Sequence, residues 1–203
     1  SNIQKPLDLK SNPGEIIFIA GSTHPQEEEI ILDIYNNLKK EFNTLKLILA
    51  PRHIERIQNL EKLIKNYNLI YEKLSKFATF LNTDICLVDT IGQLSGLYKI
   101  ADIVFVGGSL VKKGGHNIIE PAYFAKPIIF GNFMFNFRDI ADLFLEKNAA
   151  ICVKNKEDFL EKMIYFLKNP EERVALGQRA LKLVEKNRGA TKRNIDLIKT
   201  IIK

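Results

Sequence analysis

Ile103–Phe130 reads IVFVGGSLVKKGGHNIIEPAYFAKPIIF, and this stretch holds the unit that decides the fold. A short apolar run, IVFV, leads through a glycine-rich loop into an amphipathic stretch, and a second apolar run, PIIF, follows. Both runs are apolar on both faces, as parallel strands covered by helices on each side must be. The stretch therefore predicts a strand, a helix and a second strand parallel to the first.

The same alternation recurs along the chain and predicts one α/β domain, a doubly wound parallel sheet of six or seven strands. Strands are expected at Ile16–Ala20, Leu45–Ala50, Ile85–Asp89, Ile103–Val106, Pro127–Phe130 and Ala150–Val153, with a further short one near Leu69–Tyr71. Helices are expected at 25–42, 53–67, 92–101, 116–125, 137–147 and 156–168. Two more helices, 170–187 and 190–202, are expected to be separated at Arg188-Gly189.

The composition is that of a globular protein. Of the 203 residues, 46% are hydrophobic and 27% are charged, which excludes an intrinsically disordered chain. No apolar run approaches the ~18 residues of a membrane span, and the N-terminus lacks the basic-then-apolar layout of a signal peptide. Cys86 and Cys152 each lie in an apolar run, so we expect both to be buried thiols of a protein from a reducing compartment.

The net charge of +6 is concentrated in the last fifty residues. Residues 1–153 carry 17 basic and 17 acidic side chains, whereas residues 154–203 carry 13 and 7. Such a basic segment fits a solvated lysine-rich helix surface, an anionic lipid surface or an acidic neighbouring domain. Nucleic acid is not an expected partner, because the basic residues are not interleaved with aromatic ones and no nucleic-acid-binding motif occurs.

Ligands of open α/β sheets bind beyond the carboxyl ends of the strands, so the loops that leave the strands are the candidate site. The first reads GSTHP from Gly21 and continues to three glutamates. This pattern predicts a helix start with a hydroxyl cap and a proline in its first turn. Equally, the hydroxyls of Ser22 and Thr23 can form a polar pocket for a ligand.

The second and third loops offer donors to an anion. Arg52 follows Pro51 at the end of a buried strand, and its forked donors suit a phosphate. Because a cation opposes the helix dipole at a helix start, we favour binding over a structural role for Arg52. In the third loop, Asp89–Leu94, backbone amides at 91–93 can face a ligand, or the loop is a threonine-capped helix start.

The fourth loop, Val106–Pro121, contains four glycines in the nine residues 107–115. Asn117 and Glu120 are three residues apart, which places both on one face of the expected first helical turn. Glu120 can accept hydrogen bonds from two ribose hydroxyls, and the glycine-rich backbone and the helix start can hold a phosphate. The loop matches neither GxGxxG nor GxxxxGK[ST], so it predicts neither a dehydrogenase nor an ATPase.

The sequence contains no arrangement that predicts nucleophilic catalysis or a metal site. No Ser/His/Asp or Cys/His set has motif spacing, and the three histidines are scattered along the chain.

The stretch FVGGSLVKKGGHNIIEPAYFAKPIIFG, followed by FMFNF, closely resembles the C-terminal domain of the 3-deoxy-manno-octulosonic acid (Kdo) transferases. The stretches GSTHPQEEE, ILAPRH and DTIGQL resemble that family's other loops in the same order, so the likeness covers about residues 15 to 152. It implies the Rossmann-like C-terminal half of a two-domain GT-B glycosyltransferase. Residues 1–203 would then be one donor-binding domain, with 170–203 as its C-terminal helices and the N-terminal acceptor domain absent.

The resemblance also implies an activity. The family transfers Kdo from CMP-Kdo to a lipid A precursor (lipid IVA) in lipopolysaccharide biosynthesis. It does so with inversion, with no cofactor or essential metal, on the cytoplasmic face of the inner membrane of Gram-negative bacteria. The general base belongs to the N-terminal domain, so no catalytic residue is assigned here, and residues 1–203 are expected to be soluble but inactive alone.

The binding residues implied by the resemblance lie on the loops singled out above. Those expected to hold the CMP part are Pro51, Arg52, Ile91, Gly92, Gln93, Asn117, Ile118, Ile119 and Glu120. Gly108 and Ser109 would lie close to the phosphate or the sugar, and Ser22, Thr23 and His53 are further candidates. The family usually has Glu where this chain has Gln93, so an amide contact would replace a carboxylate contact.

Two other functions fit the loops. One is a different GT-B sugar-nucleotide transferase or epimerase, and the other is a non-catalytic nucleotide-binding module. The first of these commonly places two acidic residues around the glycine-rich loop, where this chain has Lys112 and Lys113.

Overall fold

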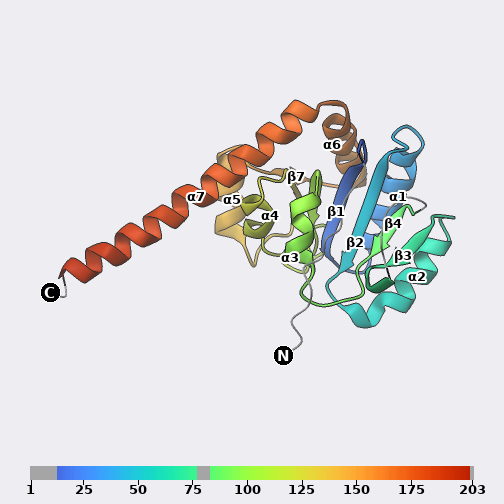
Figure 1. The fold of residues 1–203 in the computed structure, drawn as a ribbon, viewed down its shortest axis with the longest axis horizontal. Helices are drawn as coiled ribbons and strands as arrows, with labels where there is room; N and C mark the ends of the chain where they lie inside the picture. The colour runs from blue at the N-terminus through green and yellow to red at the C-terminus, as the bar shows by residue number, and fades with distance from the viewer. Residues whose placement is uncertain (1–12, 77–82, 202–203) are drawn as a thin grey trace.

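The computed structural model describes residues 13–76 and 83–201, with side chains described as far as residue 187. In this part of the chain, seven strands form one sheet in the order β3-β4-β2-β1-β5-β6-β7, and every pair is parallel (Figure 1). The strands are β1 (Ile16–Thr23), β2 (Leu45–Pro51), β3 (Tyr71–Lys73), β4 (Ile85–Leu87), β5 (Ile103–Val106), β6 (Ile128–Gly131) and β7 (Ile151–Val153).

Helices cover both faces of the sheet, because the strands are apolar on both sides. In β1, Ile17 and Ile19 face one core and Phe18 and Ala20 face the other. The first core is closed by α3 (Leu94–Leu97), α4 (Ile119–Tyr123), α5 (Arg138–Glu146) and most of the buried side chains of α7 (Pro170–Ile201). The second is closed by α1 (Glu27–Lys39), α2 (Ile57–Lys65) and α6 (Lys156–Lys168). The predicted doubly wound parallel sheet is therefore confirmed.

The expected strands are all present. The main differences concern the helices and the short strand expected near Leu69–Tyr71. The short strand near Leu69–Tyr71 is present as β3, which begins at Tyr71, where it pairs with Ile85. Short 3₁₀ turns, η1 (Ile54–Arg56) and η3 (Tyr98–Ile100), complete two of the expected helices, and η2 (Leu74–Lys76) follows β3.

The helix expected at 116–125 is shorter than predicted. The α4 helix starts at Ile119, because Pro121 has no N–H and is tolerated only in the first turn of a helix. Asn117 therefore lies before the helix rather than in its first turn.

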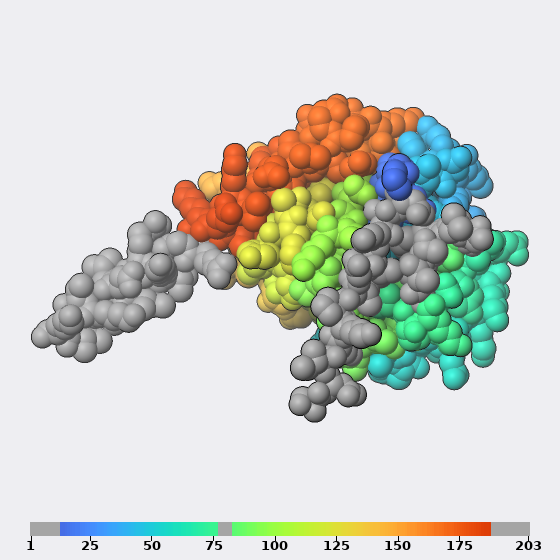
Figure 2. Space-filling view, in the orientation of Figure 1, coloured from blue at the N-terminus to red at the C-terminus, as the bar shows by residue number. Residues whose placement is uncertain are grey.

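The expected break at Arg188-Gly189 is wrong, since α7 is one helix of 32 residues through both positions. A glycine inside a helix costs only about 1 kcal/mol relative to alanine, so it does not by itself end one. The described part of α7 packs along α4, as the adjoining orange and yellow surfaces of Figure 2 show. Residue 202, the last of the expected second helix, lies outside the described residues.

Part of the basic excess after residue 153 is neutralised within the domain. Lys156 on α6 pairs with Asp33 on α1, and Lys168 pairs with Glu41 at 2.8 Å. These surface ion pairs reduce, but do not remove, the basic excess that the sequence pattern assigned to a solvated helix surface, an anionic lipid surface or an acidic neighbouring domain. Among the described residues, no helix is both long enough and apolar enough to cross a membrane.

The cysteines differ in burial. Cys86 is fully buried, and burial raises the pKa of its thiol. Cys152 is only half-buried and donates to Asn132 Oδ1 at 3.3 Å, so the expectation of two buried thiols holds for Cys86 alone.

Candidate functional site

The sheet places a topological switch point between β1 and β5, because the chain moves outward from β1 in one direction and then returns to add β5 on its other side. Ligands of open α/β sheets bind in the crevice at such a point. Here the loops after β1 and β5 touch backbone to backbone, since a Cβ added at Gly107 would collide with the Ser22 carbonyl oxygen. Ser22 itself is left-handed, with φ of 56°.

Glu27, the first residue of α1, joins these two loops. Its side chain is fully buried and accepts four backbone N–H bonds, from His24 at 3.0 Å, Gly108 at 2.7 Å, Ser109 at 2.9 Å and Leu110 at 2.9 Å. Burial raises the pKa of Glu27, while the four donors favour the carboxylate and oppose that rise. The amides of Gly108, Ser109 and Leu110 are therefore used by Glu27 and do not face a phosphate. The rest of the loop backbone and the helix start stay the expected phosphate donors.

Ser109 fixes the same loop from its other side. It is fully buried, and its hydroxyl donates to the Val106 carbonyl oxygen at 2.5 Å and accepts the Gly131 N–H at 2.8 Å. These bonds connect the end of β5 to the end of β6. The Ser109 side chain thus positions the loop, whereas Gly108, with φ of 68°, forms the bend beside it.

The expected hydroxyl cap of α1 is not formed. The residue before the helix is Gln26, which makes no side-chain cap, and Pro25 precedes the helix instead of lying in its first turn. Thr23 is buried and its hydroxyl donates to Glu28 Oε1 at 3.1 Å. The hydroxyl is therefore not available to a ligand, contrary to the expectation.

Glu28, like Glu27, is fully buried, but it is neutralised by a side chain. Arg56 of η1 donates two hydrogen bonds to the two carboxylate oxygens of Glu28, at 3.0 and 2.9 Å. A bidentate pair of this kind fixes both direction and distance. It holds the loop after β2 against the start of α1.

Pro51 and Arg52 lie at the end of β2, next to the first loop. Pro51 is buried, and the Arg52 N–H donates to the Thr23 carbonyl oxygen at 2.9 Å, which fixes the backbone of Arg52 at the crevice. The Arg52 side chain is exposed and makes no ion pair with another described residue. Its guanidinium is thus available to an anion.

The third loop brings 91–93 to the start of α3. Ile91 and Gly92 are exposed, Gln93 is partly buried, and Gly92 is left-handed with φ of 82°. The alternative of a threonine cap is not seen, because α3 begins at Leu94 without a side-chain cap. The Thr90 hydroxyl is buried and finds no hydrogen-bond partner within the described residues.

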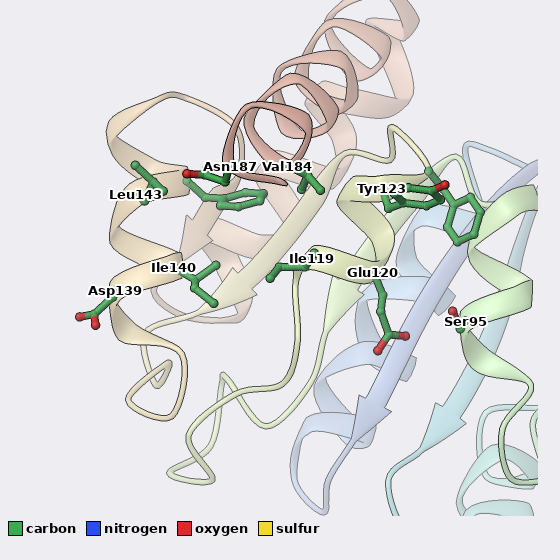
Figure 3. A pocket seen from close by; sticks show the side chains of 11 residues that line it. Ser95, Ile119, Glu120, Tyr123, Asp139, Ile140, Leu143, Val184 and Asn187 are labelled. Carbon is green, nitrogen blue, oxygen red and sulfur yellow. The ribbon is translucent and has the colours of Figure 1, made fainter. Parts of the chain in front are cut away.

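Asn117 and Glu120 lie together, as expected, although only Glu120 is in the helix. Asn117 Nδ2 donates to Glu120 Oε1 at 3.2 Å, and Asn117 Oδ1 accepts the Ile119 N–H at 2.9 Å. Glu120 is exposed, and Figure 3 shows its carboxylate directed toward the side of Ser95 on α3. Ile118 is fully buried in the core, so only its backbone can meet a ligand.

A pocket of about 760 Å³ opens beside Glu120, between α4, α5 and α7 (Figure 3). Its lining is mainly apolar and includes Ile119, Tyr123, Ile140, Leu143 and Val184. The sequence reasoning did not predict this pocket. The sequence pattern that could have indicated it is the pair of apolar residues Ile119 and Tyr123, which are one helical turn apart. In the structure these two residues are 39% and 53% exposed.

The three histidines, scattered in the sequence, come together at the switch point. His24 Nε2 and His116 Nε2 are 3.0 Å apart, and the two rings are parallel with centroids 5.3 Å apart. The His53 ring lies 5.7 Å from that of His24. Sequence reasoning missed this cluster, although each histidine follows a strand end or the glycine-rich loop. Within the described residues, no three His, Cys, Asp or Glu side chains are placed to hold a metal ion.

The pKa values of the paired histidines are low. Burial, followed by the nearby His116, lowers the pKa of His24 to about 4. Burial, followed by the charge of Arg52, also lowers the pKa of His116. Both rings are thus neutral at neutral pH.

Three comparisons place this arrangement among known proteins. Residues 1–183 match the family described as glycosyl transferases group 1. The chain is 43% identical over 174 residues to the 3-deoxy-D-manno-octulosonic acid transferase of Rickettsia felis, covering 84% of this chain and 37% of that protein. It is 40% identical over 186 residues to the enzyme of the same name from Haemophilus influenzae, covering 90% and 43%.

A solved structure agrees over nearly its whole length. The C-terminal CMP-Kdo binding domain of WaaA from Acinetobacter baumannii superimposes with a TM-score of 0.80 at 31% identity, covering 85% of this chain and 90% of that domain. The chain thus spans well under half of the curated relatives it matches, and nearly all of one crystallised domain.

Proposed function

The chain belongs to the group 1 glycosyltransferases, and we propose that it is the donor-binding part of a Kdo transferase, which holds CMP-Kdo while Kdo is transferred to a lipid A precursor. The likeness to Kdo transferases and to a CMP-Kdo binding domain supports this proposal. The observation that carries it is the pair of exposed charged groups at the carboxyl ends of the strands. Arg52, directly after β2, is proposed to meet an anion, and Glu120, in the first turn of α4 after the glycine-rich loop, is proposed to meet hydroxyls.

Each group has a distinct task in the proposed site. Glu120, oriented by Asn117 at 3.2 Å, accepts hydrogen bonds from the ribose hydroxyls. Arg52 offers its forked donors to the phosphate. The exposed backbone of Ile91 and Gly92 lies on the neighbouring loop and contacts the nucleoside. Gly108 and Ser109 give the crevice its shape, because their amides are already bonded to Glu27.

The remaining parts of the reaction are proposed to lie outside residues 1–203. The full-length relatives are more than twice as long as the matched segment, and we assign the acceptor site and the general base to the rest of the enzyme. Residues 1–203 alone are then expected to bind donor without transferring Kdo. The full enzyme would act on the cytoplasmic face of the inner membrane, where the basic surface after residue 153 faces anionic lipid.

Calorimetry with CMP tests the donor site directly. Glu120→Gln is expected to lose about 1–3 kcal/mol of CMP binding, roughly 5- to 150-fold in Kd, because a neutral amide makes weaker bonds to the ribose. Glu161→Gln, an exposed substitution on α6 at the opposite face of the sheet, is the matched control and should bind CMP normally. UMP and GDP should bind more weakly than CMP.

Two results would contradict the proposal. Unchanged CMP affinity in Glu120→Gln would remove Glu120 from the site. Equal or tighter binding of UMP would favour a different sugar-nucleotide enzyme of the same fold.

A further inference from the structure

The His24–His116 pair lies where the proposed donor phosphate would bind. A Cβ added at Gly108 would come within 3.2 Å of the His116 ring and 3.4 Å of the His24 ring, so both rings lie against the bend of the glycine-rich loop. This bend is at the switch point between β1 and β5. The two rings therefore lie at the position where open α/β sheets bind their ligands.

The loop amides at this position cannot serve the ligand. The N–H groups of Gly108, Ser109 and Leu110 donate to Glu27, so the usual backbone donors for a phosphate are occupied. An anion at this bend therefore finds no donor in these three amides. The side chains nearest the bend are the two imidazoles of the pair.

The contact between the rings fixes where their protons are. Because the two Nε2 atoms are 3.0 Å apart, one of them carries the hydrogen that the other accepts. In the neutral pair, one Nδ1 then carries a hydrogen and the other Nδ1 is bare. Uptake of one proton from solvent converts the bare Nδ1 into a donor and gives the pair a positive charge.

The charged groups around the pair are mostly cationic. Lys113 and Arg56 act on His24, Arg52 acts on His116, and His53 acts on both rings. In the absence of an anion, these charges and burial keep both rings neutral.

The acidic groups nearby are already engaged. Glu27 is bonded to backbone N–H groups, and Glu28 is bonded to Arg56. Glu55 lies 3.2 Å from His53. Glu28 is neutralised by Arg56, whereas the partners of Glu27 are neutral N–H groups that do not cancel a charge. The charges that act on the two rings are nevertheless cationic, and an entering anion would oppose them.

We propose that the His24–His116 pair binds the phosphodiester of the donor and takes up one proton when the phosphodiester enters. This inference rests on the proposed function, since it deepens the description of the same site. The pair would thereby supply a cation and a second outward N–H only when the ligand is present. Binding should consequently tighten as the pH falls, by at most about tenfold per pH unit for one linked proton.

The test is calorimetry with cytidine 5′-methyl phosphate, a phosphodiester whose single charge is constant across the relevant pH range. Titrations at about pH 5.5, 6.5 and 7.5, in buffers of different ionisation enthalpy, measure the protons taken up on binding. We expect proton uptake and tighter binding at lower pH. Cytidine, which lacks the phosphate, should bind without either effect.

The variants identify the group that takes up the proton. His116→Gln and His24→Gln keep a polar side chain but cannot titrate, so each should abolish proton uptake. Nitrogen NMR of the wild-type protein reports the protonation of each histidine ring directly. Because the chain has only three histidines, this measurement needs no variant. On addition of cytidine 5′-methyl phosphate, the His24 and His116 nitrogens should show protonation at a higher pH.

The outcomes separate this inference from the proposed function. Binding without proton uptake, or uptake that persists in His116→Gln, overturns the role of the pair and leaves the Glu120 test untouched. Absence of binding by both cytidine compounds and by CMP at every pH overturns both proposals. If a variant fails to fold, unchanged histidine nitrogen signals in the liganded wild-type chain still refute the inference.

Discussion

Replacing Glu27 by Gln tests whether a buried carboxylate holds the glycine-rich loop in place. Each carboxylate oxygen accepts two N–H groups, with Ser109 and Leu110 on Oε1 and His24 and Gly108 on Oε2. Glutamine has one oxygen and one NH₂ group, so in either orientation two backbone donors face an NH₂ and lose their acceptor.

The magnitude follows from these two donors. A buried donor without a partner costs about 1–3 kcal/mol, so two of them cost about 2–6 kcal/mol. The neutral amide is less costly to bury than a carboxylate, which offsets part of this loss. We expect a net destabilisation of about 3 kcal/mol, a fall of roughly 6–12 °C in Tm for a domain of this size.

Thermal and urea denaturation followed by circular dichroism measure the loss. Glu29→Gln is the matched control, because Glu29 is exposed on the same helical turn and its substitution should change stability by less than about 0.5 kcal/mol. Hydrogen exchange at Gly108, Ser109 and Leu110 should become faster in Glu27→Gln alone. Equal stability of the two variants, with unchanged exchange, would refute the assignment of Glu27 as the acceptor for this loop.

Two further predictions concern packing and pH. Gly177→Ala should lower Tm, although alanine favours helices, because the added methyl group would collide with the Ala125 carbonyl oxygen. Gly96→Ala should not lower Tm, because its methyl group meets nothing within 4 Å. Equal melting temperatures of the two variants would contradict this explanation. Stability should fall as the pH drops from about 6.5 to 4, because burial and His116 hold the pKa of folded His24 at about 4 and the unfolded chain binds the proton first. Urea midpoints across this range should depend less on pH in His24→Gln, and an equally steep dependence in that variant would count against His24.

The sheet could be predicted because its signal is local. Ile17 and Phe18 are adjacent and both fully buried, so an apolar run of this kind belongs between two layers of helices. The limits of the helices were less predictable. The position of Pro121 delays the start of α4, and Gly189 does not end α7.

The exposed polar groups of the loops were predicted better than the buried ones. Arg52 and Glu120 belong to recognisable loop motifs, and both are exposed in the structure. Glu27 looked like an ordinary acidic residue at a helix start, because its partners in the loop are more than 80 residues away. His24 and His116 are 92 residues apart, and only the sheet order brings them together.

The position of Glu27 also determines what kind of anion recognition the crevice can have. Where loop amides face a phosphate, the donors are permanent and their strength does not depend on pH. Here Glu27 occupies the amides at 108–110, so these three donors cannot meet the charge of a ligand. Among the side chains that can meet an anion, a guanidinium is a permanent cation, whereas an imidazole is charged only after it takes up a proton. Cytidine lacks the phosphate, so a pH series with cytidine and with cytidine 5′-methyl phosphate on one protein separates the proposed phosphate contact from the proposed ribose contact.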